Sequence, residues 1–190
     1  MAKILGHKRQ IELISNAIKQ KNIPNAWLFF GSKGIGKALL AQKVAHLIAS
    51  LDFENQETID KLSSQNLIDV DIKPDIRNIY YCDRQKEEKK EKKNKFISID
   101  DIRKMQKSFS LASVDRTYRT CIIDSAEDLN LQSSNALLKI LEEPPERTLF
   151  IIICSNMQSV IPTVASRCQK LQFHNLDKSE MIELTKKLIK

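Results

Sequence analysis

Gly31-Ser32-Lys33-Gly34-Ile35-Gly36-Lys37-Ala38 is the stretch that decides the fold of this 190-residue chain. Its spacing matches G-x-x-x-x-G-K, the phosphate-binding loop in which glycines let the backbone curl around an anion and direct N–H groups at it. The apolar run 26–30 precedes the loop, and apolar residues at helical spacing follow it. The sequence therefore predicts a phosphate-binding loop between a strand and the N-terminus of a helix.

The residue after the loop lysine is Ala38, where active P-loop enzymes use a serine or threonine hydroxyl to hold Mg²⁺. Asp124 ends the apolar run 119–124 and stands where such proteins place the aspartate that orients the metal. Ala38 argues against magnesium binding and Asp124 argues for it, so the sequence leaves magnesium binding open. The loop is better suited to holding a phosphate than to hydrolysing one.

Strand and helix patterns alternate along the rest of the chain. Residue patterns predict strands at 76–82, 96–99, 119–124, 148–154 and 170–173, and helices at 6–20, 100–109, 130–143, 160–167 and 179–190. Asp100 is the expected N-cap of the helix at 100–109. Pro144-Pro145 is expected to end the helix at 130–143. The run 148–154 is the most apolar and should lie near the sheet centre. This order favours an α/β fold with a mostly parallel sheet and helices on both faces.

Composition narrows the class of protein only slightly. The net charge of +7 permits an acidic partner such as DNA but does not require one. No apolar run is long enough to span a membrane and the N-terminus lacks a signal peptide pattern, so we expect a cytoplasmic protein without a membrane partner. The four cysteines are widely spaced and predict neither a disulfide nor a zinc site. Residues 86–95 hold six lysines and three glutamates, which favours a solvated connection over a DNA contact.

Several of these stretches together resemble one family. The loop at 31–37, Ile122-Ile123-Asp124, the stretch 135–145 (NALLKILEEPP) and Ser166-Arg167-Cys168 occur in the order found in ATPase domains of the AAA+ clamp-loader family. The resemblance runs from about Leu5 to Phe173. It implies an AAA+ P-loop domain at 1–175 and the start of a helical lid domain at 176–190, with no counterpart of the family's collar domain.

The resemblance also implies partners and site residues. The partners would be gamma/tau-type ATPase subunits and a delta-type subunit in a hetero-pentamer of the DNA polymerase III holoenzyme, which loads a sliding clamp onto primed DNA. Arg167, in the S-R-C motif, would project toward the nucleotide of a neighbouring subunit as an arginine finger. Residues expected to contact a nucleotide in this chain are Gly31, Gly34, Ile35, Gly36, Lys37, Ala38, Asp124 and Asn156.

Three departures from the family pattern concern hydrolysis. Ala38 removes the magnesium hydroxyl, Ser125 replaces the glutamate that activates water, and Glu127 replaces the following aspartate or histidine. Only Cys82 lies where the family's zinc module needs four cysteines, so we expect no zinc site and assign no metal-ligating residue. These departures resemble the non-hydrolysing, delta-prime-type members and imply at most weak binding of ATP or ADP.

Two functions from other classes compete with this interpretation. An active small P-loop NTPase or nucleotide kinase would need a hydroxyl at position 38 and a water-activating group near Asp124, and neither is present in the sequence. A stand-alone DNA-binding module would use residues 86–95 and would bind DNA with strong salt dependence in the absence of partners.

Overall fold

A single parallel sheet forms the centre of the molecule. The computed structural model describes residues 4–62, 64–71, 78–82, 96–110 and 118–188. Five strands pair in the order β2-β3-β4-β1-β5, all parallel. Parallel neighbours need crossover connections, and helices supply most of them. The strands are β1 (Ala26–Phe30), β2 (Ile79–Cys82), β3 (Arg119–Asp124), β4 (Thr148–Cys154) and β5 (Gln169–Gln172).

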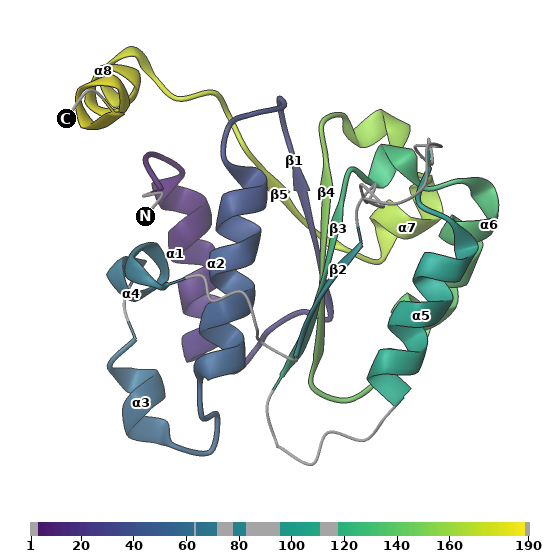
Figure 1. Cartoon of the computed structure of the whole chain (residues 1–190). Helices are drawn as coiled ribbons and strands as arrows, with labels where there is room; N and C mark the ends of the chain where they lie inside the picture. The colour runs from purple at the N-terminus through teal and green to yellow at the C-terminus, as the bar shows by residue number, and fades with distance from the viewer. Residues whose placement is uncertain (1–3, 63, 72–77, 83–95, 111–117, 189–190) are drawn as a thin grey trace.

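Helices cover both faces of this sheet, as the alternating pattern predicted (Figure 1). On one face lie α1 (Lys8–Lys19), α2 (Lys37–Ser50), α3 (Gln56–Asp60) and α4 (Ser64–Asp69). On the other lie α5 (Ile99–Ser110), α6 (Leu131–Glu142) and α7 (Pro162–Ser166). Two short 3₁₀ turns, η1 (Ala126–Asp128) and η2 (Met157–Ser159), follow β3 and β4. The last helix, α8 (Lys178–Leu188), lies beyond β5 near the N-terminal turn.

Side chains that alternate along each strand build two cores. In β1, Trp27 and Phe29 pack with α1 and α2, whereas Ala26 and Leu28 pack with the helices of the opposite face. All seven residues of β4 are buried because helices cover both sides of this strand. The prediction that 148–154 lies near the sheet centre is confirmed by its middle place in the strand order.

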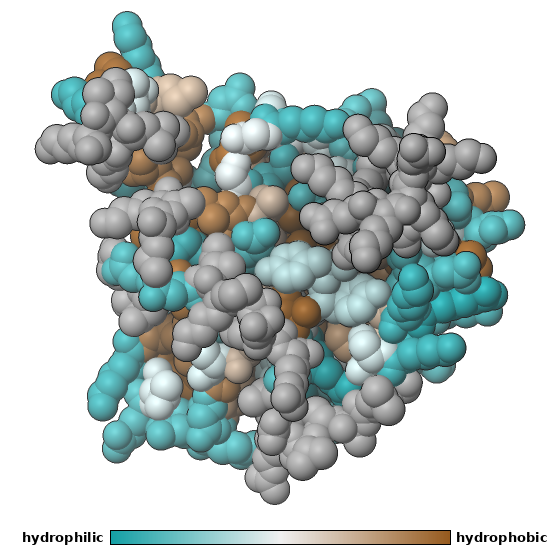
Figure 2. All heavy atoms as spheres, in the orientation of Figure 1, coloured by the Kyte–Doolittle hydropathy of each residue, from teal (hydrophilic) through white to brown (hydrophobic). Residues whose placement is uncertain are grey.

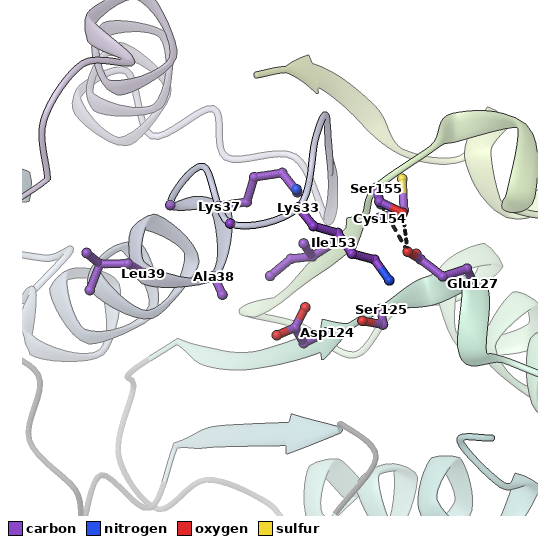
Figure 3. Close-up of a pocket in the computed structure, with 12 residues that line it drawn as sticks. Lys33, Lys37, Ala38, Leu39, Asp124, Ser125, Glu127, Ile153, Cys154 and Ser155 are labelled. Carbon is purple, nitrogen blue, oxygen red and sulfur yellow. Dashed lines mark hydrogen bonds between the residues drawn. The ribbon is translucent and has the colours of Figure 1, made fainter. Parts of the chain in front are cut away.

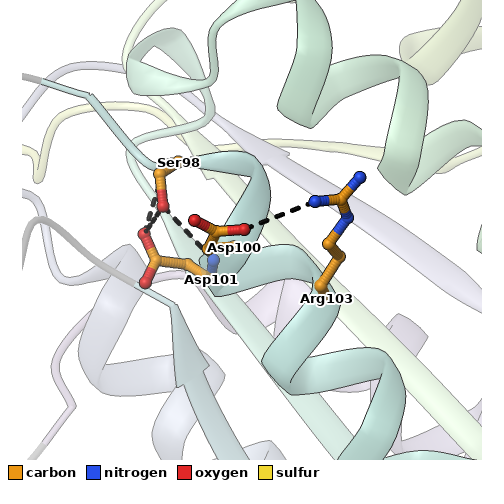
Figure 4. A network of polar contacts seen from close by, with 4 residues as sticks. All are labelled: Ser98, Asp100, Asp101 and Arg103. Atoms are coloured by element: carbon orange, nitrogen blue, oxygen red, sulfur yellow. Dashed lines mark hydrogen bonds and ion pairs between the residues drawn. The ribbon is translucent and has the colours of Figure 1, made fainter.

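The start of α5 differs from the prediction. Residues 96–99 form no strand; Ile97 makes only an isolated bridge to Leu129, and the helix already begins at Ile99. Asp100 is therefore not the N-cap. Ser98 takes that place: its hydroxyl oxygen accepts the N–H of Asp101 at 3.3 Å, and the Asp101 carboxylate accepts the N–H of Ser98 at 2.9 Å (Figure 4). This reciprocal capping box stabilises the first turn better than one side chain could.

Two short helices were not predicted. The polar stretch 52–66 contains α3 and the start of α4, and the Asn55 side chain caps α3 by accepting the N–H of Thr58 at 3.2 Å. Of the predicted strand 76–82, residues 78–82 are described, and β2 begins at Ile79. The lysine-rich stretch 86–95 lies outside the described residues. Within the described part of the chain, no helix is both long and apolar enough to cross a membrane.

Candidate functional site

The predicted loop joins β1 to α2, and its first position requires glycine. Gly31 has φ +148°, and a Cβ on it would lie 2.3 Å from the carbonyl oxygen of Phe173. Gly34 has φ +79° but faces open space. The backbone therefore turns sharply beside the end of β5 and leads through Gly36 into the 14-residue helix α2, whose positive end lies at the loop.

The side chain of Lys37, at the end of the loop, folds back into the loop. Its side chain is almost fully buried, and Nζ donates hydrogen bonds to the carbonyl oxygens of Gly31 and Ser32, each at 2.7 Å. Burial lowers the pKa of Lys37, and the negative charges of Asp124 and Glu127 oppose this shift in part. These contacts use two of the three N–H donors of the ammonium group, so a phosphate bound in the loop would share Lys37 with the two carbonyl oxygens.

A cavity of about 370 Å³ opens between the loop and the carboxyl ends of β3 and β4. Ligands of open α/β sheets bind at this end of the strands. Lys33 and Lys37 reach toward it from the loop, and Asp124 and Glu127 approach it from the other side (Figure 3). The lining residues are Lys33, Gly34, Gly36, Lys37, Ala38, Leu39, Asp124, Ser125, Glu127, Ile153, Cys154 and Ser155.

The donor set around this cavity does not fit Mg²⁺ as active P-loop enzymes hold it. Ala38 lines the cavity with a methyl group, so position 38 offers no hydroxyl to a metal ion. Ser125 follows Asp124 with φ +71° and offers a hydroxyl where a carboxylate would take a proton from water. Among the described residues, no group of three or more His, Cys, Asp and Glu side chains could hold a metal ion.

Glu127 is tied to the end of β4 by a contact that sequence reasoning missed. Its Oε1 accepts hydrogen bonds from the hydroxyl of Ser155 at 2.5 Å and from the N–H of Ser155 at 3.2 Å. Burial alone would raise the pKa of Glu127, but these hydrogen bonds outweigh it and the pKa is lowered. A carboxylate with a lowered pKa is a weak general base. No local pattern pairs residues 28 positions apart, so only the fold reveals this contact.

Three predicted contact residues do not line this cavity: Gly31, which lies against Phe173, Asn156 and Ile35. Asn156 is exposed and its amide oxygen accepts the N–H of Gln158 at 3.0 Å, so Ser155 rather than Asn156 faces the cavity. The carbonyl oxygen of Ile35 lies 2.6 Å from Nε2 of His7. Ile35 lines a second cavity of about 560 Å³ on the other side of the loop. The walls of this cavity also include Ile4, Leu5, Leu39, Leu176 and Met181.

Arg167 lies away from both cavities. It caps the C-terminus of α7, just before β5 begins at Gln169. Gln169 pairs with Trp27 near the start of β1, whereas the phosphate-binding loop follows the other end of that strand. The five residues of β1 span about 16 Å at about 3.3 Å per residue. Arg167 therefore lies near the end of the sheet opposite to the loop of its own chain.

The family described as "DNA polymerase III, delta subunit" matches residues 6–177. The chain is 27% identical to DNA polymerase III subunit gamma of Buchnera aphidicola over 98% of this chain and 48% of that protein. It is 26% identical to subunit tau of Bacillus subtilis over 98% of this chain and 31% of that protein. It is 29% identical to subunit delta' of Bacillus subtilis over 88% of this chain and 47% of that protein.

Solved structures share the fold. A DNA polymerase III gamma subunit-related protein of Thermotoga maritima superposes with a TM-score of 0.65 and 21% identity, covering 94% of this chain and 49% of that one. The RuvB Holliday junction branch migration motor of the same organism gives a TM-score of 0.62 and 16% identity, covering 96% of this chain and 50% of that one. The fold is thus that of AAA+ P-loop proteins, and the chain spans about half the length, or less, of these relatives.

Proposed function

Because the chain belongs to the DNA polymerase III delta subunit family, we propose that it works as a non-hydrolysing clamp-loader subunit of the delta-prime type. Its role would be to support ATP-dependent loading of a sliding clamp onto primed DNA during replication. Its partners would be gamma/tau-type ATPase subunits and a delta-type subunit. The relatives named gamma, tau and delta' support this class of partner.

The absence of hydrolysis by this chain is supported by the contents of the cavity beside the loop. Hydrolysis needs a metal held next to the phosphates and a group that activates water. Ala38 contributes no oxygen, Ser125 contributes no carboxylate, and the Glu127 carboxylate is held by Ser155. Together, these three features support the proposal that this chain does not hydrolyse ATP.

Binding of ATP or ADP can persist without hydrolysis. The loop and the N-terminus of α2 supply the N–H groups that recognise phosphate, and Lys37 supplies a cation. The second cavity, beside Ile35 and Leu39, has an apolar wall suited to a nucleoside. We expect weak affinity because Lys37 already has two carbonyl partners and because no magnesium hydroxyl is present.

A role for Arg167 at a neighbouring subunit is supported by its place at the opposite end of the sheet from the loop of its own chain. From there it cannot reach a phosphate held by Lys37, whereas a subunit packed against α6 and α7 would bring its own nucleotide close. The planar guanidinium suits a phosphate oxygen fork. In this proposal Arg167 is an arginine finger in trans, and residues 176–190 begin a helical lid domain.

The test measures two activities of the natural full-length subunit. Alone, with saturating Mg-ATP, it should release phosphate no faster than the spontaneous background. With its partners, it should be required for loading a sliding clamp onto primed DNA. A turnover on the order of 1 s⁻¹ or more by the subunit alone, abolished by Lys37→Ala, would contradict the proposal and favour an active P-loop NTPase. Strong, salt-sensitive DNA binding by the subunit alone would favour the DNA-binding module.

A further inference from the structure

Two acceptors from two different helices hold the guanidinium of Arg167. Nη1 donates to the backbone carbonyl oxygen of Thr163 at 2.9 Å, and Nη2 donates to Oε1 of Glu142 at 2.5 Å. Glu142 is the last residue of α6 and Thr163 belongs to α7. The ion pair is partly exposed, with 34% of the Arg167 side chain and 51% of the Glu142 side chain accessible. Both terminal nitrogens are thus engaged while the side chain stays accessible from outside.

The two acceptors are fixed because their helices are packed. Leu137, Ile140 and Leu141 bury one side of α6, and the double proline after Glu143 prevents the helix from continuing. In α7, which starts at Pro162, the side chains of Val164 and Ala165 are buried. The Thr163 acceptor is a backbone atom and has no side-chain freedom. An arginine bound to these two points loses much of its rotamer freedom before any ligand arrives.

The two contacts leave donors for a third partner. A guanidinium carries five N–H donors. The described contacts to Glu142 and Thr163 use two of them, one on each terminal nitrogen. The second hydrogen of each terminal nitrogen and the Nε hydrogen remain able to meet a phosphate fork without breaking either contact. The carboxylate therefore need not be displaced when the arginine acts.

From this geometry we propose that Glu142 is a positioning residue for Arg167. Its carboxylate, together with the Thr163 carbonyl oxygen, holds the guanidinium in one orientation before the nucleotide of a neighbouring subunit is reached. The proposal rests on the proposed function of Arg167 as a finger in trans. Preorganisation of this kind raises the rate of the chemical step because less orientation remains to be fixed in the transition state.

The first measurement needs no partner. In the subunit alone, ¹⁵N relaxation of the Arg167 Nε–H group should report an ordered side chain. Glu142→Ala should make the group mobile on the picosecond to nanosecond timescale. Glu143→Ala is the matched control: it removes the adjacent exposed carboxylate, which makes no described contact with Arg167. Equal order in the wild type and Glu142→Ala would overturn the proposal whatever the function of Arg167.

The second measurement uses the assembled complex, isolated by size, in which the ATPase subunit facing Arg167 is the only one able to hydrolyse ATP. Glu142→Ala should lower kcat between about 10-fold and 100-fold with KM for ATP unchanged, because misorientation of a catalytic group by about 1 Å costs this much. Glu142→Gln should recover part of the rate, since a neutral amide oxygen still accepts a hydrogen bond at about half the strength. Glu143→Ala should match the wild type.

The same assay separates the two proposals. If Arg167→Ala leaves kcat unchanged, the finger role fails and the proposed function must be revised. If Arg167→Ala slows hydrolysis but Glu142→Ala does not, the finger stands and the positioning role of Glu142 is wrong. A faster rate in Glu142→Ala would also overturn it, because the carboxylate would then restrain Arg167 rather than orient it.

Discussion

Replacing Gly31 by alanine should damage the fold far more than the same change at Gly34. At Gly31, with φ +148°, an added Cβ would lie 2.3 Å from the carbonyl oxygen of Phe173. The N–H of Phe173 bonds to the carbonyl oxygen of Phe30 at 2.8 Å, so the clash falls where β5 ends beside β1. At Gly34, with φ +79°, no atom lies within 4 Å of the added Cβ.

The two positions therefore separate backbone strain from steric overlap. Gly34→Ala should cost about 1 kcal/mol, since left-handed strain of about 1–2 kcal/mol is partly offset by the reduced freedom of the unfolded chain. Gly31→Ala should cost about 3–4 kcal/mol, because up to about 3 kcal/mol of strain adds to about 1 kcal/mol for a weakened strand-end hydrogen bond. For a chain of this size the difference corresponds to a Tm lower by roughly 4–12 °C.

Urea unfolding followed by circular dichroism measures both free energies of unfolding, and the slope m checks that the transition remains comparable between variants. If Gly31→Ala and Gly34→Ala differ by less than about 1 kcal/mol, the close approach of the loop to Phe173 is wrong, and with it the shape of the phosphate site.

Three further predictions concern the core and the site. Leu137→Ala, at a fully buried position of α6, should lower the free energy of unfolding by about 2–5 kcal/mol. Leu131→Ala, at a position that is 67% exposed, should change this free energy by no more than about 0.5 kcal/mol. Equal losses in urea unfolding would refute the packing of α6. Burial raises the pKa of Cys168 to about 12, so at pH 8 a disulfide reagent should modify this thiol only after unfolding, and prompt modification of the native chain would contradict its burial. The lowered pKa of Glu127 means that its hydrogen bonds from Ser155 stabilise the fold above the ordinary pKa of 4.5 and lose this effect as the pH falls through the lower folded value. Ser155→Ala should therefore cost about 1.5 kcal/mol at pH 7 and progressively less below pH 4.5, and a cost independent of pH would exclude this charge-assisted contact.

The strands and the loop could be predicted from the sequence because their signals are local. The runs 26–30, 119–124 and 148–154 are continuous and apolar, and the structure has strands with these same bounds. The loop follows from glycine spacing alone. The match of residues 6–177 to a DNA polymerase III family confirms the family-level prediction, whereas the finer delta-prime assignment stays a proposal.

Other features of the structure could not be predicted because they depend on contacts that local sequence patterns do not determine. Ser98 and Asp100 are both good N-cap residues, and the reciprocal bond between Ser98 and Asp101 selects the earlier one. Helix α3 lies in a polar stretch and forms because Ile59 is buried against the α1–α2 side of the sheet. The contacts of Glu127 with Ser155 and of Arg167 with Glu142 join residues 28 and 25 positions apart, so they exist only once the strands are paired.

In the proposed function, this subunit does not hydrolyse ATP itself but acts on the nucleotide of a neighbour through Arg167. The most direct test is single-turnover ATP hydrolysis at the one facing site of the assembled, DNA-bound complex, with Arg103→Ala as the matched control, since Arg103 is an exposed arginine paired with Asp100 on α5. Arg167→Ala should lower this rate on the order of 10³-fold, and Arg167→Lys should not restore it because a lysine lacks the planar fork. A rate in Arg167→Ala equal to that of Arg103→Ala would contradict this role of Arg167.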